Sequence, residues 1–268
     1  MKKVCSDGKL TIVMIVKNEE RYIKNSILNI KDFADKIVIF VDKTSTDNTL
    51  KIVKEFKKNC KIYIADTKGT AETLREKSIR SCDTEWVYWS DPDEFFTKEL
   101  KNEIRDTIKK NPTENAFFIR RQEYFLYKPL FICKQLKLLR RKKMLSFSTN
   151  VHSEPIVEGK VKELNNILYH YSPQEIDSWM DKIKRVTIQE SKKYSHLNNF
   201  SAFLNLMFFR SITHFLYNFI VNKAILSGYP GFLYSLLAGP IYSWIIYLRY
   251  FENRFKPRKN IRKLFNLN

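Results

Sequence analysis

Two aspartates, Asp91 and Asp93, flank a proline directly after the apolar run at residues 86–89. A tight turn at the end of a strand would hold both carboxylates together, and carboxylate oxygens are the ligands that Mg²⁺ and Mn²⁺ prefer. A cation bound there keeps positions for substrate phosphates and can stabilise negative charge on a departing diphosphate. The first hypothesis is therefore a divalent-metal site for a nucleoside diphosphate.

The same residues also fit the start of a helix. Asp91 could be the N-cap, Pro92 the first helical residue and Glu94 the acid of a capping box. Capping needs one acid, however, whereas acids follow three apolar runs of the same predicted sheet. That repetition favours the metal site.

Two further polar residues lie near predicted strand ends. Asp42 ends the second apolar run and could accept a hydrogen bond from a ribose hydroxyl or a base N–H. Arg75 lies on a predicted helix and could reach a phosphate, but for a single helical arginine an exposed salt bridge with a nearby acid such as Glu72 is the more common role.

His152 and Glu154 form a third polar cluster. A lone histidine is more often structural than functional. Its pairing with an acid allows one of them to complete a metal shell and the other to act as general base.

The elements that must position these residues follow an α/β pattern. Short β-branched runs alternate with amphipathic segments, which predicts a parallel sheet with helices on both faces and ligands at the carboxyl ends of its strands. The expected strands are residues 11–16, 36–41, 61–65 and 86–89. After a helix near 98–110 we expect antiparallel additions at 116–125 and 136–147, a strand pair within 160–171 and a helix over 173–194.

The last third is apolar, since Lys223 is the only Lys, Arg, Asp or Glu between Ser211 and Leu248. Gly228–Gly231 and Gly239–Pro240 are expected to break it into segments of about the 17 residues that a spanning helix needs. A basic tail follows, rich in Lys and Arg. We expect helices lying in the membrane interface, with two spanning helices or a homo-oligomer interface as the alternatives.

Bulk composition limits the classes of partner. The chain has 268 residues and a formal net charge of +19, which favours anionic partners. Its four cysteines include no Cys-x-x-Cys pair, so the sequence contains no zinc-finger pattern. No RNA-binding motif is present, and we expect no nucleic acid. No secretory signal is recognisable, which predicts a cytoplasmic protein, peripheral on the inner face of the membrane. The rival hypotheses are a metal-dependent nucleotidyltransferase and a non-enzymatic basic nucleic-acid- or membrane-binding protein.

Taken together, these motifs resemble family 2 glycosyltransferases of the GT-A fold. The resemblance rests on Val16-Lys-Asn-Glu-Glu20, the Val41–Asp47 loop, Arg75 and the segment 86–94. Within the family the chain looks most like the lipopolysaccharide-core glucosyltransferase type, because of segments at 138–141, 151–152, 157–159 and His170-Tyr-Ser172. The resemblance implies a catalytic domain at 1–200 that is built on a Rossmann-like, mixed and mainly parallel sheet. This domain would consist of a nucleotide-sugar half to about residue 110 and an acceptor half at 111–200. An apolar helical region that associates with the membrane would follow at 201–268.

The resemblance also implies roles for individual residues. The nucleotide-sugar donor would be bound by Val16, Asn18, Glu19, Asp42, Arg75 and Asp91. The metal, Mg²⁺ or Mn²⁺, would be held by Asp91, Asp93 and His152. An acceptor hydroxyl, on a saccharide or a lipid-linked acceptor, would be deprotonated by a carboxylate and attack the anomeric carbon with inversion, which makes Glu154 and Asp93 the catalytic candidates. Relatives usually read Val-His-Glu, whereas Ser153 separates His152 from Glu154 here, and Pro92 replaces a small residue in the acidic turn.

Overall fold

The computed structural model describes residues 8–68, 71–149, 153–171 and 175–255. The chain divides into two compact units. The first holds Met1–Glu123 and Ile132–Tyr171, and the second holds Tyr124–Phe131 and Ser172–Asn268. Each unit is described by itself.

The first unit is built on an eight-stranded sheet of order β3-β2-β1-β4-β7-β6-β10-β5. Its parallel part consists of β1 Leu10–Val16, β2 Lys36–Asp42, β3 Cys60–Ala65 and β4 Trp86–Ser90. The rest consists of β7 Lys128–Arg140 antiparallel to β4, β6 Ala116–Phe125, β10 Val161–His170 parallel to β6, and β5 Glu94–Phe96 antiparallel to β10. The predicted mixed, mainly parallel GT-A sheet is confirmed.

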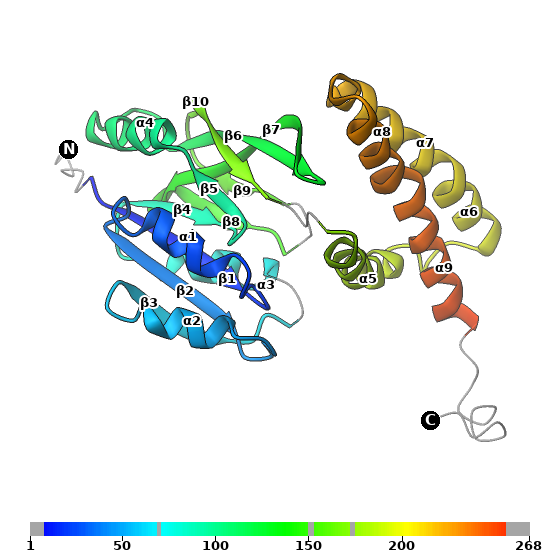
Figure 1. Ribbon diagram of the computed structural model, residues 1–268, viewed down its shortest axis with the longest axis horizontal. Helices are drawn as coiled ribbons and strands as arrows, with labels where there is room; N and C mark the ends of the chain where they lie inside the picture. Colours follow the sequence, from blue (N-terminus) through cyan, green and yellow to red (C-terminus); the bar gives the residue numbers. More distant parts are fainter. Residues whose placement is uncertain (1–7, 69–70, 150–152, 172–174, 256–268) are drawn as a thin grey trace. The chain divides into compact units, whose positions relative to one another are not determined.

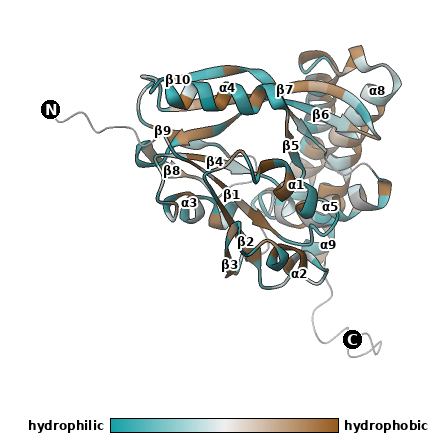
Figure 2. Ribbon diagram, turned by 60° about the vertical axis from the view of Figure 1, so that its left-hand side comes forward, coloured by the Kyte–Doolittle hydropathy of each residue, from teal (hydrophilic) through white to brown (hydrophobic). Residues whose placement is uncertain are grey.

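Helices cover both faces of this sheet (Figure 1). One face packs on α1 Ile23–Ile30, α2 Thr49–Glu55 and α4 Lys98–Lys109. The other packs on α3 Glu72–Arg80 and on a two-stranded sheet of β8 Met144–Phe147 and β9 Pro155–Val157. Successive side chains of β1 enter opposite cores, Ile12 and Met14 on one side and Val13 on the other, as strand geometry requires. Figure 2 shows the resulting hydrophobic colour of the central strands.

Two sequence-based expectations in this unit are wrong. The antiparallel addition expected at 136–147 is divided, because residues 136–140 end β7 and Met144–Phe147 form β8 of the separate two-stranded sheet. Residues 160–171 form the single strand β10 instead of a strand pair. The polar residues Asn165 and Asn166 resemble a turn, but they lie where the pairing with β6 shifts register, between Glu163 and Ile167. Glu103 of α4 accepts hydrogen bonds from both of their amides at 2.8 Å, so the irregularity is satisfied within the strand.

The second unit is mostly helical. After α5, Ile176–Lys192, come two long helices joined at residues 222–228. The first runs through α6 Asn199–Phe203, a π-helical stretch Leu204–Phe209, α7 Arg210–Leu216 and a second π-helical stretch Tyr217–Val221. The second runs through α8 Tyr229–Leu236, a π-helical stretch Leu237–Ile241 and α9 Tyr242–Phe255.

The expected break at Gly239–Pro240 does not occur. Pro240 lies inside the π-helical stretch, and the helix continues to Phe255. A π-helical turn is wider than an α-helical turn and accommodates a residue that cannot donate the usual hydrogen bond. In the part of the chain that the structure describes, Tyr229–Phe255 is the one helix long and apolar enough to cross a membrane by length and composition.

Candidate active site

The acidic turn does not begin a helix. Glu94 starts the short strand β5, and α4 begins only at Lys98, where Thr97 Oγ1 accepts the cap hydrogen bond from the Leu100 amide. The capping interpretation of Asp91 is therefore wrong. Pro92 is accommodated in the turn between β4 and β5.

Asp91 binds cationic side chains from two other elements. Its Oδ1 lies 3.1 Å from Arg75 Nη2 of α3, and its Oδ2 lies 3.1 Å from Lys137 Nζ of β7. The Arg75 guanidinium lies 4.0 Å from Glu72 and 4.3 Å from the centre of the Trp89 ring. Burial alone would raise the pKa of Asp91, but Lys137 and Arg75 hold it well below its usual value. Asp91 is therefore ionised across the physiological range.

Lys137 is fully buried and was not expected from the sequence. Its Nζ lies 2.7 Å from Glu94 Oε1, and Glu94 is fully buried too. The ammonium also lies 3.7 Å from the centre of the Trp89 ring. The available signal was a lysine inside an apolar run, between Leu136 and Leu138.

Asp93 faces His170 at the end of β10. The distance from Asp93 Oδ2 to His170 Nε2 is 3.3 Å, and the other ring nitrogen lies 2.6 Å from Glu123 Oε2. Burial alone would lower the pKa of His170, but Glu123 and Asp93 raise it to about 9. Arg121 donates to Glu123 at 2.6 Å and to Glu94 at 3.3 Å. Because Glu94 also binds Lys137, Arg121 connects the His170–Glu123 pair to Lys137. His170 belongs to the His-Tyr-Ser segment noted above, which was the signal for it.

The donors around the turn fit a divalent cation in part. Among the described residues no group of three His, Cys, Asp or Glu side chains is arranged to hold a metal. Asp93 lies beside His170, which is protonated at neutral pH and would have to lose its Nε2 proton to bind a cation, whereas both oxygens of Asp91 are in ion pairs. His152, expected as a ligand, lies outside the described residues. A carboxylate and an imidazole suit Mn²⁺ when phosphate oxygens or water complete its shell.

Three expected donor-binding residues, Val16, Asn18 and Glu19, lie at the end of β1 and in the loop that follows it. Val16 is the buried last residue of β1. Asn18 has a positive φ of 55° and its Oδ1 accepts from the Thr46 amide at 2.8 Å. The Glu19 amide donates to Thr49 Oγ1 at 2.7 Å. These bonds join that loop to the residues after β2.

Asp42 is buried at the end of β2. Its Oδ1 accepts from the amide and hydroxyl of Thr44, and its Oδ2 from the amide and hydroxyl of Thr67. Burial alone would raise the pKa of Asp42, but these hydrogen bonds lower it to about 2. Asp42 thus holds the loops after β2 and β3 together, and contact with a base would require Thr44 or Thr67 to give up a bond.

Glu154 reaches the same region through the backbone. Its Oε1 accepts from the Leu136 amide at 3.0 Å, and the Leu136 carbonyl accepts from Trp89 Nε1 at 2.8 Å. Leu136 precedes Lys137 in β7. Two successive hydrogen bonds therefore connect the exposed Glu154 to the Trp89 ring. Arg75 and Lys137 contact the same ring.

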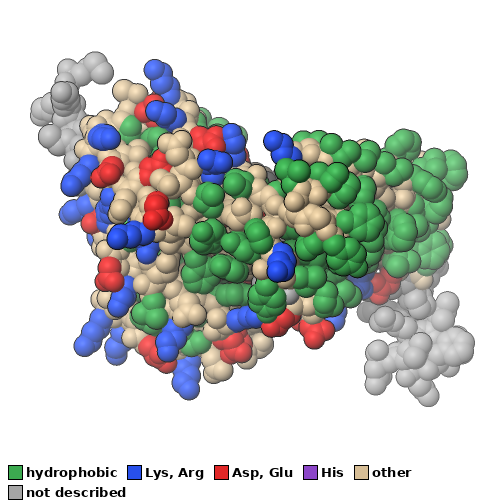
Figure 3. Space-filling view, turned by 45° about the horizontal axis from the view of Figure 1, so that its top comes forward, with side chains coloured by type: hydrophobic (Ala, Val, Ile, Leu, Met, Phe, Trp, Pro, Cys, Tyr) green, Lys and Arg blue, Asp and Glu red, His purple; other side chains and the backbone are tan. Residues whose placement is uncertain are grey.

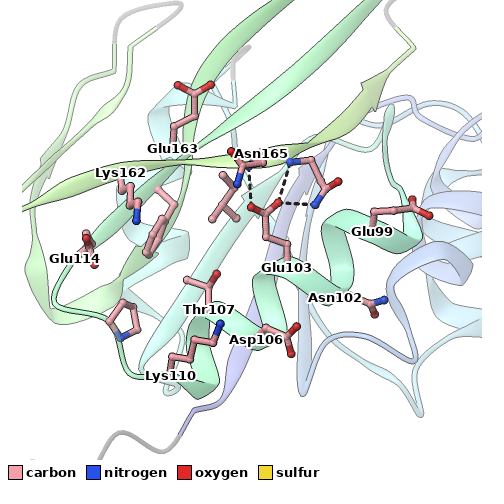
Figure 4. Close-up of a pocket in the computed structure, with 14 residues that line it drawn as sticks. Glu99, Asn102, Glu103, Asp106, Thr107, Lys110, Glu114, Lys162, Glu163 and Asn165 are labelled. Carbon is pink, nitrogen blue, oxygen red and sulfur yellow. Dashed lines mark hydrogen bonds between the residues drawn. The ribbon is translucent and has the colours of Figure 1, made fainter.

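A cleft of about 550 Å³ lies between α4 and β10 and is separate from the turn (Figure 4). Glu99, Glu103, Asp106, Lys110 and Lys162 are among its lining residues. The Glu103 carboxylate in the cleft is engaged by the amides of β10 described above. His170 is five residues beyond Asn165 on that strand, about 16 Å away.

The residues 11–154 match a family model described as glycosyl transferase family 2, and they contain the acidic turn, Arg75 and Lys137. The chain belongs to this family. The glycosyltransferase is 26% identical over 257 residues to an uncharacterized glycosyltransferase of Rickettsia typhi, covering 85% of this chain and 82% of the relative. It is also 26% identical over 172 residues to the prophage-derived glycosyltransferase SunS of Bacillus subtilis, covering 62% of this chain and 40% of SunS.

A similar fold occurs in the mannosyltransferase PcManGT from Pyrobaculum calidifontis, solved in complex with GDP-Man and Mn²⁺. The TM-score is 0.54 with 14% identity, over 93% of this chain and 88% of PcManGT. At that identity the similarity concerns the fold alone.

Proposed function

We propose that this glycosyltransferase moves a sugar, with inversion, from a nucleoside-diphosphate sugar to a saccharide or lipid-linked acceptor in cell-envelope glycan synthesis. The acceptor class follows from the resemblance to lipopolysaccharide-core glucosyltransferases. One observation carries the proposal of a reactive site at the turn: Asp91 and Asp93 face Arg75, Lys137 and His170, which come from three different elements.

Donor binding is proposed at the carboxyl ends of β1, β2 and β4. Arg75 and Lys137 supply positive charge where the diphosphate would lie, and the loops that carry Asn18 and Asp42 would enclose the nucleoside. The complex of PcManGT with GDP-Man and Mn²⁺ supports this class of donor for the shared fold.

A divalent cation would be held by Asp93, with His170 or His152 as imidazole ligand and Asp91 on the other side of the turn. Such a cation stabilises the negative charge on the leaving diphosphate. Arg75 and Lys137 orient Asp91 by binding its two oxygens separately. The turn is therefore set before the donor arrives.

Glu154 is proposed as the general base for the acceptor hydroxyl. The Leu136 amide holds its Oε1, which fixes the direction of the carboxylate while Oε2 accepts the proton. Because Glu154 is exposed, an acceptor can approach it from solvent.

The decisive experiment compares two aspartates at strand ends. Asp93→Asn removes the charge of the proposed cation ligand, whereas Asp66→Asn removes an acid after β3 that pairs with Lys43 at the surface. With UDP- or GDP-sugars and Mn²⁺, release of nucleoside diphosphate should fall by about a thousandfold in Asp93→Asn, a loss of ~4 kcal/mol in transition-state stabilisation. Asp66→Asn should keep the wild-type rate.

The same assay tests the cation. Chelation should abolish release in the wild type, and Mn²⁺ or Mg²⁺ should restore it. Turnover that needs no metal and persists in Asp93→Asn would remove the turn from the reaction.

A further inference from the structure

Large apolar side chains are exposed along the two long C-terminal helices. Leu226 and Tyr229 at their junction are 80% and 72% exposed, and Phe209 in the first helix is 67% exposed. Other exposed members are Ile212, Leu216, Ile220, Val221, Trp244, Leu248 and Phe251. Figure 3 shows this gathering of hydrophobic side chains over the C-terminal helices. We call it the apolar face.

The buried side of the same helices carries small residues. Gly231, Ser235, Gly239 and Ser243 recur at every fourth position of the second helix and are buried. A Cβ at Gly239 would lie 2.7 Å from the backbone nitrogen of Phe215, so the two helices meet at their backbones. A water-soluble helix pair buries its large apolar residues, whereas this pair exposes them, as helices in contact with lipid do.

Charge is kept away from the apolar face. Arg210 is the only Lys, Arg, Asp or Glu in the first helix, and it binds Tyr194 Oη at 2.9 Å and Glu190 at 3.4 Å, from α5 and the residues after it. Lys223 lies in the junction, and the second helix carries no such residue before Arg249. Lys223 is exposed, and its long side chain can reach the headgroups, so the face can leave water without burying an unpaired charge.

A basic segment directly follows the apolar part of the second helix. Residues 249–263 contain seven Lys or Arg and one acid, Glu252. Each basic residue near an anionic bilayer contributes about 1 kcal/mol of attraction. A bilayer with anionic headgroups therefore complements the face and the segment together.

Both ends of the helix pair are held by protein of the same unit. Near the junction, Ser227 Oγ donates to the carbonyl of Leu130, close to the start of β7, at 2.6 Å. At the other end the Tyr250 hydroxyl donates to the Leu197 carbonyl at 3.0 Å. A spanning pair would carry its junction across the bilayer together with Leu130. The strand β7, which contains Leu130, would then have to enter the lipid, where strands of an open sheet do not occur.

We propose that the apolar face lies in the interface of an anionic lipid bilayer, with the two helices parallel to its surface and neither spanning it. This goes beyond sugar transfer and does not depend on it. A second copy of the chain fits less well, because it would place two basic segments against one shared apolar contact.

Flotation of the full-length protein with vesicles tests the proposal. Vesicles of 70% phosphatidylcholine and 30% phosphatidylglycerol should carry the wild type, and pure phosphatidylcholine vesicles should carry several-fold less. The variant L216E/L248E should float about tenfold less well on the anionic vesicles. L145E/I156E makes the same change at two equally exposed apolar residues of the first unit and should float like the wild type.

Trp244 gives a second readout that does not depend on a destabilising change. It is 45% exposed, whereas Trp86 and Trp89 are buried and the half-buried Trp179 lies on α5, outside the apolar face, so anionic vesicles should shift the fluorescence maximum to the blue much more in the wild type than in Trp244→Phe. Equal flotation of L216E/L248E and L145E/I156E overturns the proposal. So does a lipid-independent dimer, seen by light scattering, that L216E/L248E converts to a monomer. Protein that stays in the membrane after carbonate extraction at high pH overturns the non-spanning arrangement.

Discussion

At the scale of single residues, the site depends on charges that solvent does not reach. Lys137 and Glu94 are both fully buried and lie 2.7 Å apart, and Lys137 also binds Asp91. Removing one partner of a buried ion pair leaves an uncompensated charge, while removing both can be nearly neutral. The pair therefore fixes the acidic turn more than it stabilises the fold.

Lys137→Met is predicted to lower the free energy of unfolding by about 3 kcal/mol, because the buried Glu94 then loses its nearer cation and keeps only Arg121, at 3.3 Å. The double variant Lys137→Met/Glu94→Gln should recover most of that loss. Urea denaturation measures both. Lys134→Met, three residues earlier on β7 with a side chain 61% exposed, is the matched control and should change stability by less than about 1 kcal/mol. Equal losses in the single and double variants would contradict the argument.

The sequence pointed to part of this site and missed the rest for a physical reason. Asp91, Asp93 and Arg75 lie beside strand and helix ends, where motif spacing is informative, and the structure brings Asp91 and Arg75 into contact. Lys137, Arg121 and Glu123 come from the middle of β7 and β6, strands that pair through the sheet order. Their proximity depends on which strands become neighbours, and one sequence does not state that.

At the scale of elements, short apolar runs in the sequence were sufficient to predict β1 to β4, because strands buried on both faces of a parallel sheet are apolar along most of their length. This signal failed where polar residues are satisfied internally. A turn was predicted near Asn165 and Asn166, because nothing in the local sequence shows that the Glu103 carboxylate will accept hydrogen bonds from their amides. A helix end was predicted at Gly239–Pro240, because a π-helical stretch that can contain a proline has no simple sequence signature.

The contact between the two long helices gives a prediction at the same scale. Gly239→Ala places a methyl group 2.7 Å from the Phe215 nitrogen and 3.0 Å from its Cα, both backbone atoms that cannot rotate away. We expect a loss of about 1–3 kcal/mol. Ser243→Ala, one turn later on the same buried side, removes a hydroxyl that has no hydrogen-bond partner among the described residues and should be neutral or stabilising. Thermal unfolding of the two variants measures the contrast, and similar melting temperatures would show that the helices do not pack closely at Gly239.

At the scale of the whole molecule, the positive charge is unevenly distributed along the chain. The formal net charge is +19, yet the long C-terminal helices contribute almost none of it before Arg249. The excess belongs to the first unit and to the basic segment at the end of the chain, which are the parts that we propose to bind a diphosphate and an anionic bilayer. A positive net charge of this size also makes the folded chain sensitive to acid, because protonation of carboxylates adds to the self-repulsion.

Asp42 gives that sensitivity a specific component. Its pKa in the folded protein is about 2, against an ordinary value of 3.8, because Thr44 and Thr67 donate to the ionised form. A carboxyl whose folded pKa is lowered stabilises the protein above its unfolded pKa and loses that contribution as the pH falls through the folded value. The difference of nearly two units corresponds to roughly 2 kcal/mol, lost from about pH 4 to below pH 2. Urea denaturation between pH 5 and pH 2.5 measures this contribution, and the free energy of unfolding should fall less steeply with pH for Asp42→Asn than for the wild type. Glu55→Gln, which changes an exposed acid on α2, is the control and should follow the wild-type slope. Parallel slopes for Asp42→Asn and the wild type would mean that the four hydrogen bonds to this carboxylate do not favour its charged form.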